Sequence, residues 1–273
     1  MSKMLQSLKH HWPEYLIEAW GLGMFMIAAC VCAAFIFAPA SPLHISGTFP
    51  ANLSMGLGMG STALGVMLSP WGKRSGAHIN PSVTLAFYRL GKIKAWDAFF
   101  YVAAQFIGGT AGVVLSWLML GTMLEAPEVN YVVTIPKEAG VAAAFIAEFI
   151  ISFVLMLMVL ITLNSEKLKN LTPYLAGLLI TAYIVFEVKY SGMSMNPART
   201  FASAIVGNIW TGWWLYFVSP PLAMLTAAEV YLFFKGSAAV KCAKLHHHNK
   251  QRCVFCNKPS ETATAKSNHP IRV

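Results

Sequence analysis

Two copies of one polar phrase interrupt an otherwise apolar chain. The first copy reads SGAHINPSVTLA from Ser75, and the second reads SGMSMNPARTFA from Ser191. Asn is favoured immediately before a helix and Pro at the first helical position, so each Asn-Pro pair predicts a helix start. An Asn whose oxygen caps a helix keeps amide N–H groups that can donate to a passing solute. The candidate residues are Asn80, Pro81 and Ser82 in the first copy and Asn196, Pro197 and Ala198 in the second.

The composition is typical of a protein that lies in a lipid bilayer. The chain has 273 residues, of which 56% are hydrophobic and 11% are charged, whereas a soluble domain carries about 25% charged residues. The net charge of +9 raises the alternative of a nucleic-acid-binding protein. The basic residues, however, occur in short clusters between apolar runs, which is the pattern of membrane topology. No nucleic-acid partner is therefore expected.

Six apolar runs are long enough to cross a bilayer as helices, which takes about 20 residues each. They cover about 15–37, 51–70, 96–121, 141–163, 173–189 and 213–234. The first run is too long for the core of a cleaved signal peptide and is interpreted as a retained span. Two shorter stretches, about 80–88 and 196–206, begin at the two copies of the phrase. We therefore predict an all-α membrane protein with six transmembrane helices and two re-entrant half-helices.

The two copies are separated by three predicted spans, an odd number, so they enter the bilayer from opposite faces. The chain then consists of two inverted three-helix repeats, about 14–121 and 141–235, in one membrane domain, 14–235. Such pseudo-symmetry places a functional site near the bilayer midplane. Residues 1–13 are expected to form the N-terminal segment, and residues 236–273 a flexible tail.

The distribution of Lys and Arg predicts the orientation. With a cytoplasmic N-terminus, all of the 20 basic residues except Lys137, Lys189 and Arg199 fall on the cytoplasmic side, as the positive-inside rule requires. We therefore expect both termini in the cytoplasm, and an integral protein of the plasma membrane or of a bacterial inner membrane.

Half-helices that enter from opposite faces meet with their N-termini at the centre of the membrane. The positive ends of both helix dipoles then coincide with the asparagine amides. A pore with these groups at its centre disfavours cations and protons, while it conducts neutral solutes that form hydrogen bonds. Two helix caps in an ordinary bundle are the alternative. A twelve-position pattern that occurs twice, each time at a helix too short to span, favours the pore.

The paired boxes make the chain similar to a known family. Over roughly residues 10–235 it resembles the aquaporins and aquaglyceroporins of the major intrinsic protein family. The second box keeps the family's Asn-Pro-Ala form, whereas Ser82 replaces the Ala of the first box. The resemblance implies a passive channel rather than an enzyme, and a homotetramer with one pore in each subunit.

Three polar residues outside the boxes take roles from the same resemblance. An ionisable side chain inside an apolar helix usually indicates a functional role. Glu18 and Glu148 are such residues in the first and fourth spans. In the family this pair braces the loops that lead to the boxes; the alternative is a pair of helix-end carboxylates near the lipid headgroups. His78, just before the first box, is expected to be structural or pore-lining rather than catalytic.

Arg199 follows the second box, where an unpaired charge in the membrane would be expensive. The resemblance makes it the fixed donor of the outer selectivity filter; a structural, salt-bridged Arg is the alternative. Counted back without gaps, the other filter positions are Gly60, Ile184 and Met193. Strict water channels usually place an aromatic residue and a His at the first two of these positions. A slip of one residue in the count would place Met59 at the first position.

This filter predicts the solutes. Gly60 contributes no side chain, Ile184 lacks the hydrogen-bond donor that a His would provide, and Met193 is apolar and adaptable. The constriction is therefore expected to be wide and largely apolar. Such a gap suits a solute with both CH and OH edges, such as glycerol or a similar polyol, or a metalloid hydroxide, together with water. A water-selective channel is the alternative.

A secondary transporter and an intramembrane enzyme are the alternatives from other classes of function. A secondary transporter also combines broken helices with inverted repeats, but beyond Glu18 and Glu148 we expect no intramembrane acid to bind a coupling ion. An intramembrane enzyme would need a nucleophile and a base together, and His78 with Ser82 does not make a mechanism. The passive channel is the prediction.

The segment after the sixth run contains residues with metal chemistry. Cys-x2-Cys with nearby His suits a tetrahedral zinc site. The candidate ligands are Cys242, His246, His248, Cys253 and Cys256. The alternative is a disordered tail that touches anionic lipid, because the paired spacing of zinc motifs is absent and the surrounding sequence is polar and basic. Zinc is the one cofactor that the sequence suggests.

Overall fold

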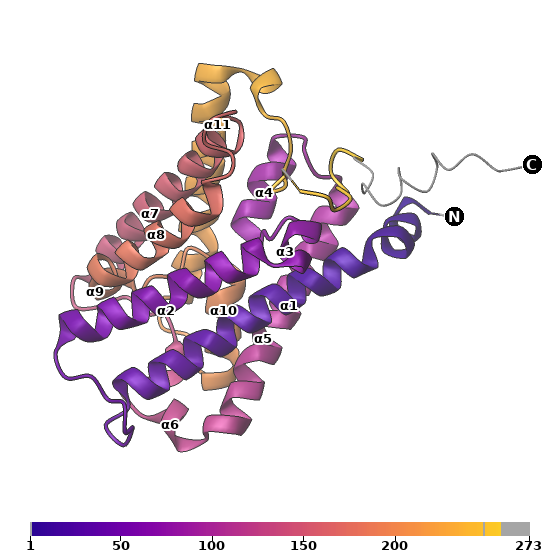
Figure 1. Cartoon of the computed structure of the whole chain (residues 1–273). Helices are drawn as coiled ribbons and strands as arrows, with labels where there is room; N and C mark the ends of the chain where they lie inside the picture. Colours follow the sequence, from indigo (N-terminus) through magenta and orange to yellow (C-terminus); the bar gives the residue numbers. More distant parts are fainter. Residues whose placement is uncertain (1, 248, 258–273) are drawn as a thin grey trace, which may run out of the picture.

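The computed structural model describes residues 2–247 and 249–257, and these residues form helices and loops without any strand. Two half-length helices, α4 (Pro81–Arg89) and α10 (Pro197–Gly207), begin at the Asn-Pro pairs. The long helices of this part of the chain are α1 (Lys3–Phe37), α2 (Thr48–Leu68), α5 (Ala95–Leu120), α7 (Gly140–Leu163), α8 (Thr172–Phe186) and α11 (Trp213–Lys235). The predicted all-α fold, with six long helices and two half-helices, is confirmed (Figure 1).

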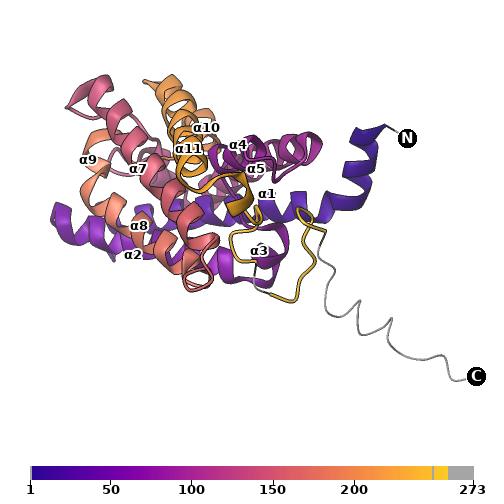
Figure 2. The same ribbon diagram turned by 90° about the horizontal axis from the view of Figure 1, so that it is seen from above.

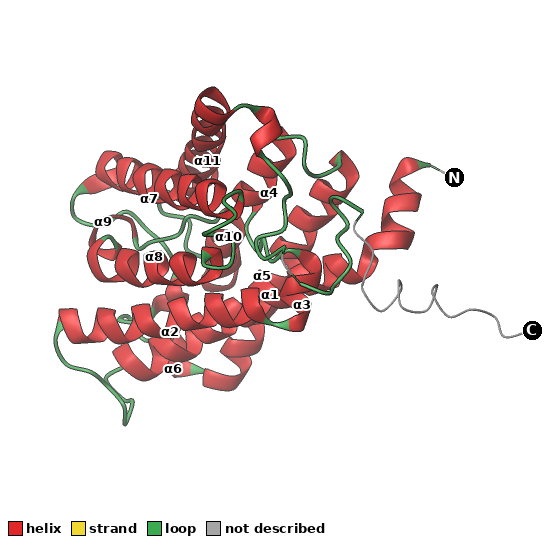
Figure 3. Cartoon of the chain, turned by 45° about the horizontal axis from the view of Figure 1, so that its top comes forward, coloured by secondary structure: helices red, strands yellow, loops and turns green. Residues whose placement is uncertain are grey.

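Short helical turns occupy several of the connections (Figure 3). They are α3 (Pro70–Ser75), α6 (Thr122–Glu125), α9 (Val188–Ser191) and the 3-10 turns η1 (Asn130–Val132) and η2 (Ser237–Ala239). α1 begins well before the predicted run, because Ser2 caps it: the Ser2 Oγ accepts a hydrogen bond from the backbone N–H of Leu5 at 3.4 Å.

Four of the long helices among the described residues, α1, α5, α7 and α11, are long and apolar enough to span a membrane. α2 is rich in glycine and α8 has only 15 residues, so neither stands out by length and mean hydropathy. These two helices pack against each other. Two of the glycines of α2, Gly56 and Gly60, lie against the α8 backbone and allow this contact.

The order of the helices is the same in the two halves of the chain. α1, α2, α4 and α5 form one half, and α7, α8, α10 and α11 the other. α1 packs along α5, α7 packs along α11, and α2 meets α8 between the halves. The half-helices α4 and α10 lie between the long helices (Figure 2). The start of α1 and residues 240–247 and 249–257 lie at one end of the molecule, here called the terminal face (Figure 1). α6 lies at the other end, the opposite face (Figure 1).

Glycines bring α1 and α5 into close contact. A Cβ atom at Gly108 would lie 2.0 Å from the carbonyl oxygen of Ala19, and one at Gly112 would lie 2.4 Å from that of Gly23. Small residues are the usual means of tight helix packing in lipid, where burial of apolar surface does not drive helices together. This crossing fixes α1 beside the loop that leads to α4.

Candidate functional site

Asn80 stands at the start of α4, in the centre of the bundle. Its Oδ1 accepts a hydrogen bond from the backbone N–H of Ser82 at 2.8 Å, and Pro81 occupies the first helical position. Its Nδ2 donates to the carbonyl oxygen of Met195 at 2.8 Å. The side chain therefore caps its own helix and ties it to the loop of the other half.

Asn196 repeats this arrangement at the start of α10. Its Oδ1 accepts from the backbone N–H groups of Ala198 at 3.1 Å and Arg199 at 3.2 Å, and Pro197 is the first helical residue. Its Nδ2 donates to the carbonyl oxygen of Ile79 at 2.8 Å. Because an amide nitrogen carries two N–H groups, each Asn retains one for the space between the half-helices.

The loop before each Asn has a strained backbone. Gly76, Ala77 and Ile79 have φ angles of 104°, 53° and 42°. The equivalent loop of the other half shows the same pattern, with φ of 56° at both Met193 and Met195. Residues with a side chain avoid this left-handed region, at a cost of about 1–3 kcal/mol each, and persist there only when their surroundings hold them.

Glu18 of α1 holds the first loop and is fully buried. Its Oε1 accepts hydrogen bonds from Ser75 Oγ at 2.8 Å and from the backbone N–H of His78 at 3.1 Å. Its Oε2 accepts from the backbone N–H of Ile79 at 2.7 Å and from Gln105 Nε2 at 2.9 Å. Four donors thus converge on one carboxylate that lies deep in the protein.

Glu148 of α7 holds the second loop in the same way and is also fully buried. Its Oε1 accepts from Ser191 Oγ at 2.7 Å and from the backbone N–H of Ser194 at 2.6 Å. Its Oε2 accepts from the backbone N–H of Met195 at 2.7 Å. The donors occupy the same positions of the duplicated phrase as those that bind Glu18.

Further residues of this network were not predicted. The Tyr101 hydroxyl donates to the carbonyl oxygen of Ser75 at 2.6 Å, and the Tyr216 hydroxyl donates to that of Ser191 at 2.5 Å. The Oε1 of the buried Glu187 also lies within hydrogen-bond distance of Ser191 Oγ, at 2.5 Å. The two tyrosines could have been found from the repeat, because each follows its Ser-Gly pair by nearly the same number of residues.

A cavity of about 200 Å³ leads from the opposite face to the two asparagines. Phe37 and Asn52 line its outer part, and Asn80 and Asn196 line its inner end. Most of the wall between them is apolar, contributed by one face each of α1, α2 and α8. The cavity therefore reaches the point where the half-helix N-termini meet.

Arg199 lines this cavity and is fixed by the backbone. Its Nη1 donates to the carbonyl oxygen of Val132 at 2.6 Å. The fixed partner is thus a carbonyl group rather than a carboxylate, so it does not neutralise the charge of the guanidinium. The remaining N–H groups of the guanidinium can donate hydrogen bonds into the cavity. Ile184 and Met193, as predicted from the sequence, lie in the same wall.

Gly60 does not lie where the ungapped count placed it. A Cβ atom at Gly60 would be 2.2 Å from Thr181 Oγ1 and 2.5 Å from the carbonyl oxygen of Gly177, both on α8. Gly60 is therefore a packing position between helices, and Met59 lines the cavity in its place. One residue along a helix turns the side chain by about 100°. A methionine side chain therefore takes up space in the cavity that a glycine would have left open.

His78 faces the C-terminal segment instead of this cavity. Its Nδ1 is 3.1 Å from Thr84 Oγ1, and its Nε2 donates to the carbonyl oxygen of Ala243 at 2.8 Å. Its ring lies between those of Phe87 and Phe255, at centroid distances of 5.2 and 5.3 Å. The side chain is 2% exposed, so it has a structural place in this form of the protein.

Ser82 fits the position that an Ala occupies in the second box. Both Ser82 and Ala198 are fully buried, and the Ser82 Oγ has no hydrogen-bond partner among the described residues. The backbone N–H of Ser82 is bound by Asn80 as that of Ala198 is by Asn196. The extra hydroxyl thus leaves the geometry of the cap unchanged.

The C-terminal segment brings Cys and His side chains together. Four potential ligand atoms lie within 4.8 Å of one another, and they belong to Cys242, His247, Cys253 and Cys256. His247 takes the place of the predicted His246, and the predicted His248 lies outside the described residues. Hydrogen bonds from Cys242 and His247 hold the pKa of the Cys253 thiol well below its usual range. A thiolate, the form that binds metals, is favoured there.

Comparison with known proteins gives one consistent result. Residues 4–231 match the family described as Major intrinsic protein. The chain is 32% identical over 201 residues to Aquaporin-5 of Mus musculus, with 72% of this chain and 74% of that protein covered. It is 32% identical over 176 residues to Probable aquaporin TIP4-1 of Oryza sativa subsp. japonica, with 62% and 68% covered.

Among solved structures, the fold is similar to that of the aquaglyceroporin from Plasmodium falciparum. The TM-score is 0.70 at 20% sequence identity, with 81% of this chain and 95% of that chain covered. Members of the family are channels and not enzymes, and the cavity that ends at paired helix N-termini fits a channel. The chain belongs to the major intrinsic protein family and is a membrane channel of the aquaporin type.

Proposed function

We propose that this channel conducts water together with small neutral solutes that carry both CH and OH groups, such as glycerol, and that it excludes ions and protons. The observation that carries the proposal is the makeup of one cavity wall. The Arg199 guanidinium lines the same cavity as the side chains of Met59, Ile184 and Met193. One fixed donor group and three apolar side chains thus face this cavity, which Lys137 and Ser194 also line.

The physical argument concerns hydration. A filter for water alone must replace most of the hydrogen bonds that a water molecule loses in single file, which takes polar groups on several sides. A polyol can instead direct its hydroxyls to the guanidinium and the asparagine amides while its CH edges contact the apolar side chains. Methionine is unbranched and adaptable, so the gap can fit solutes of slightly different shape. Metalloid hydroxides, which expose hydroxyls on all sides, match this wall less well.

Ion exclusion follows from the same groups. The N-termini of α4 and α10 place two positive dipole ends at the asparagines, and Arg199 adds a full positive charge farther out. A cation would have to shed its hydration shell next to these charges. The N–H donors of Asn80 and Asn196 orient a passing water through its oxygen, which opposes a continuous chain of proton transfers.

We also propose that the terminal face is cytoplasmic and that the channel is a homotetramer. The clustering of Lys and Arg on the termini and on the loops of that face supports the orientation. Membership of the family supports the tetramer. Exposed apolar side chains on the long helices, such as Ile107, Leu118 and Phe233, supply surface for lipid or for neighbouring subunits. Conduction requires no cofactor in this proposal.

The test is solute-driven reswelling of proteoliposomes in the presence of a membrane-permeant zinc chelator, recorded by stopped-flow light scattering. The variant is the double substitution Met59→Phe with Ile184→His, which narrows the constriction and adds a donor. The matched control is Leu178→Phe, on the same helix as Ile184 but 63% exposed on its outer side. We expect glycerol-driven reswelling in the wild type and the control, and its loss in the double variant with water permeability retained. Equal glycerol rates in all three proteins would place the filter elsewhere.

A further inference from the structure

The two halves of the conduction pathway differ. On the side of the opposite face, residues 192–196 all line the cavity. Of the equivalent residues of the first loop, 76–80, only Ile79 and Asn80 do so. The duplicated phrase gives both loops the same backbone, so the first loop should line the other half of the pathway. Something else occupies the space in front of it.

That space is filled by the C-terminal segment, residues 240–247 and 249–257. The backbone N–H of Leu245 donates to the carbonyl oxygen of Gly76 at 3.2 Å, and the carbonyl oxygen of Ala243 accepts from His78 Nε2 at 2.8 Å. The ring of Phe255 stacks on that of His78, with the two planes 3° apart. The segment thus binds the polar groups that the first loop would otherwise offer to a solute.

Phe255 sits closely on the loop backbone. A Cβ atom at Gly76 would lie 2.8 Å from the Phe255 ring, so a side chain at this position would force the ring to move. The ring also contacts Tyr101 edge-on at a centroid distance of 5.8 Å. An aromatic side chain wedged between the loop and α5 is well placed to block a narrow pathway.

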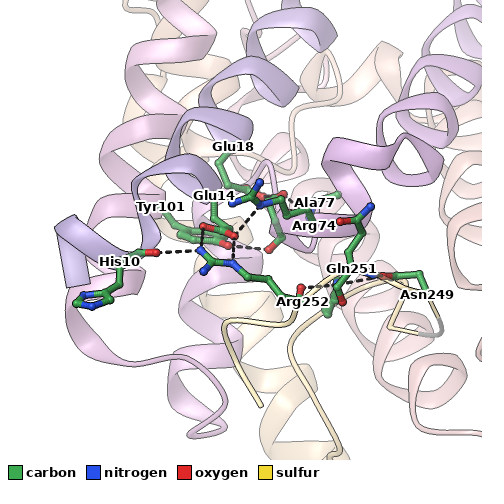
Figure 4. A network of polar contacts seen from close by, with 11 residues as sticks. His10, Glu14, Glu18, Arg74, Ala77, Tyr101, Asn249, Gln251 and Arg252 are labelled. Carbon is green, nitrogen blue, oxygen red and sulfur yellow. Dashed lines mark hydrogen bonds and ion pairs between the residues drawn. The ribbon is translucent and has the colours of Figure 1, made fainter. Parts of the chain in front are cut away.

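Polar contacts attach the segment to α1. Arg252 binds the buried Glu14 through two parallel hydrogen bonds, from Nε to Oε1 and from Nη2 to Oε2, each 2.8 Å long. The same Nη2 donates to the carbonyl oxygen of His10 at 2.9 Å, and Arg74 binds the same carboxylate (Figure 4). Bidentate pairs of this kind fix geometry as well as contribute energy.

The segment has almost no regular structure to hold its shape. Beyond the 3-10 turn η2, the described residues from 240 onward are loop. Ordering a loop costs about 1–2 kcal/mol per residue in backbone entropy. A cross-link within the segment would offset much of that cost, because it restricts the unbound ensemble as well.

The cluster of Cys242, His247, Cys253 and Cys256 provides the ligands for such a cross-link. Cys242 Sγ is 3.5 Å from Cys253 Sγ, and His247 Nε2 is 3.1 Å from Cys256 Sγ. Tetrahedral zinc with bonds of about 2.3 Å to sulfur and about 2.0 Å to nitrogen separates its ligand atoms by about 3.5–3.8 Å. The four atoms therefore need to move only slightly to surround one ion.

We propose that Zn²⁺ binds Cys242, His247, Cys253 and Cys256 and thereby holds the C-terminal segment as a plug in the terminal half of the pathway. Three thiolates and one imidazole are a closed structural zinc set, with no position left open for chemistry. Cys256 is exposed, so a metal can reach the cluster from solvent. Removal of the ion lets the segment leave the first loop and opens the channel.

A disulfide between Cys242 and Cys253 is the competing cross-link. The sulfur atoms at 3.5 Å are farther apart than a disulfide of about 2.0 Å allows. On the cytoplasmic side, thiols also stay reduced. The disulfide would use two of the four clustered residues and would leave the positions of His247 and Cys256 unexplained.

The test measures water permeability of the full-length protein in proteoliposomes under two conditions, with Zn²⁺ on both sides of the membrane and with a membrane-permeant zinc chelator. Zinc content per chain is measured by elemental analysis on the same samples. The inference rests on the proposed conduction pathway. We expect one bound zinc per chain and, on chelation, a rise of water permeability of about tenfold, which is within the usual range of coupling between two linked sites.

Two variants separate the metal site from the plug. Cys253→Ser with Cys256→Ser should bind no zinc and conduct equally with zinc and with chelator. Phe255→Ala should keep its zinc and conduct in both conditions, because the wedge is gone. The matched control, Cys32→Ser, removes a thiol from α1 far from the cluster and should behave like the wild type.

The outcomes distinguish the two proposals. If the chelated wild type and Phe255→Ala conduct water but zinc neither binds nor lowers the rate, the zinc plug is wrong and the channel stands. A response to reductant rather than to chelator would also overturn it, in favour of the disulfide. If no variant conducts above empty vesicles in any condition, the proposed conduction pathway itself fails.

Discussion

At the residue scale, the pathway depends on two buried carboxylates that hold two strained loops. Glu18 and Glu148 together accept bonds from four backbone N–H groups and from two serine hydroxyls at equivalent positions of the repeat. These hydrogen bonds offset the backbone strain of residues in the left-handed region, such as Ala77 and Met193. The carbonyl groups and the Asn caps keep their positions because the carboxylates cannot move.

Replacement of Glu148 tests this role. Glu148→Ala leaves the backbone N–H groups of Ser194 and Met195 buried without an acceptor, at about 1–3 kcal/mol each. We expect a clear drop in the unfolding temperature of the detergent-solubilised protein, followed by tryptophan fluorescence, and a smaller drop for Glu148→Gln, which keeps one acceptor. Glu166→Gln, at an exposed carboxylate, is the control. Equal unfolding temperatures for Glu148→Ala and this control would contradict the brace.

Some of these residues could be predicted from the sequence and others could not. The caps at Asn80 and Asn196 are local, since each bond spans two or three residues. Which residue of α2 faces the cavity depends on how the helix is rotated about its axis. An ungapped count across the break at Ser69 selected Gly60 instead of Met59. A count of residues measures distance along the chain and does not fix which side of a helix faces the cavity.

At the element scale, glycine at the helix crossings sets how closely the helices approach. Gly108 lies against the backbone of Ala19 on α1, whereas Gly65, inside α2, has no neighbouring atom within 4 Å of where a Cβ would stand. The two positions are both glycines in long helices but differ in what surrounds them. They form a matched pair for substitution.

We expect Gly108→Val to prevent assembly of a stable protein. Its side chain would overlap the α1 backbone, so α1 and α5 would have to separate beside the Glu18 loop. Gly65→Ala should be tolerated or stabilising by about 0.5–1 kcal/mol, since Ala is the better helix former. Size-exclusion profiles and unfolding temperatures in detergent measure both effects. A Gly108→Val protein as monodisperse and stable as Gly65→Ala would show that this crossing does not fix the bundle.

The elements themselves were largely readable from the sequence. Apolar runs of membrane length predicted the long helices, and the Asn-Pro pairs predicted α4 and α10 at their first residues. The short helices α3, α6 and α9 were not predicted, because turns of four to six residues carry little periodicity. α2 and α8 were predicted from run length even though one is glycine-rich and the other short.

At the scale of the whole molecule, the pathway is open to one face and filled at the other. The contact between His78 and Ala243 joins residues 165 positions apart, and no local pattern in the sequence signals it. The sequence showed that the C-terminal segment carries metal ligands, but only the fold shows that the segment lies on the first loop. The sequence predicted a flexible tail over residues 236–273. The structure describes residues 236–247 and 249–257 of this tail, and the C-terminal segment within them packs against the rest of the protein.

The most direct test of the central claim is the permeability of the full-length protein to water and glycerol in the same zinc-chelated proteoliposomes. We predict fast osmotic shrinkage followed by glycerol-driven reswelling well above that of empty vesicles, with no increase in proton leak measured by an internal pH dye. Fast shrinkage without reswelling would show a water-selective channel and contradict the assignment of Met59, Ile184, Met193 and Arg199 as a solute filter. A proton leak would contradict the exclusion at the paired asparagines.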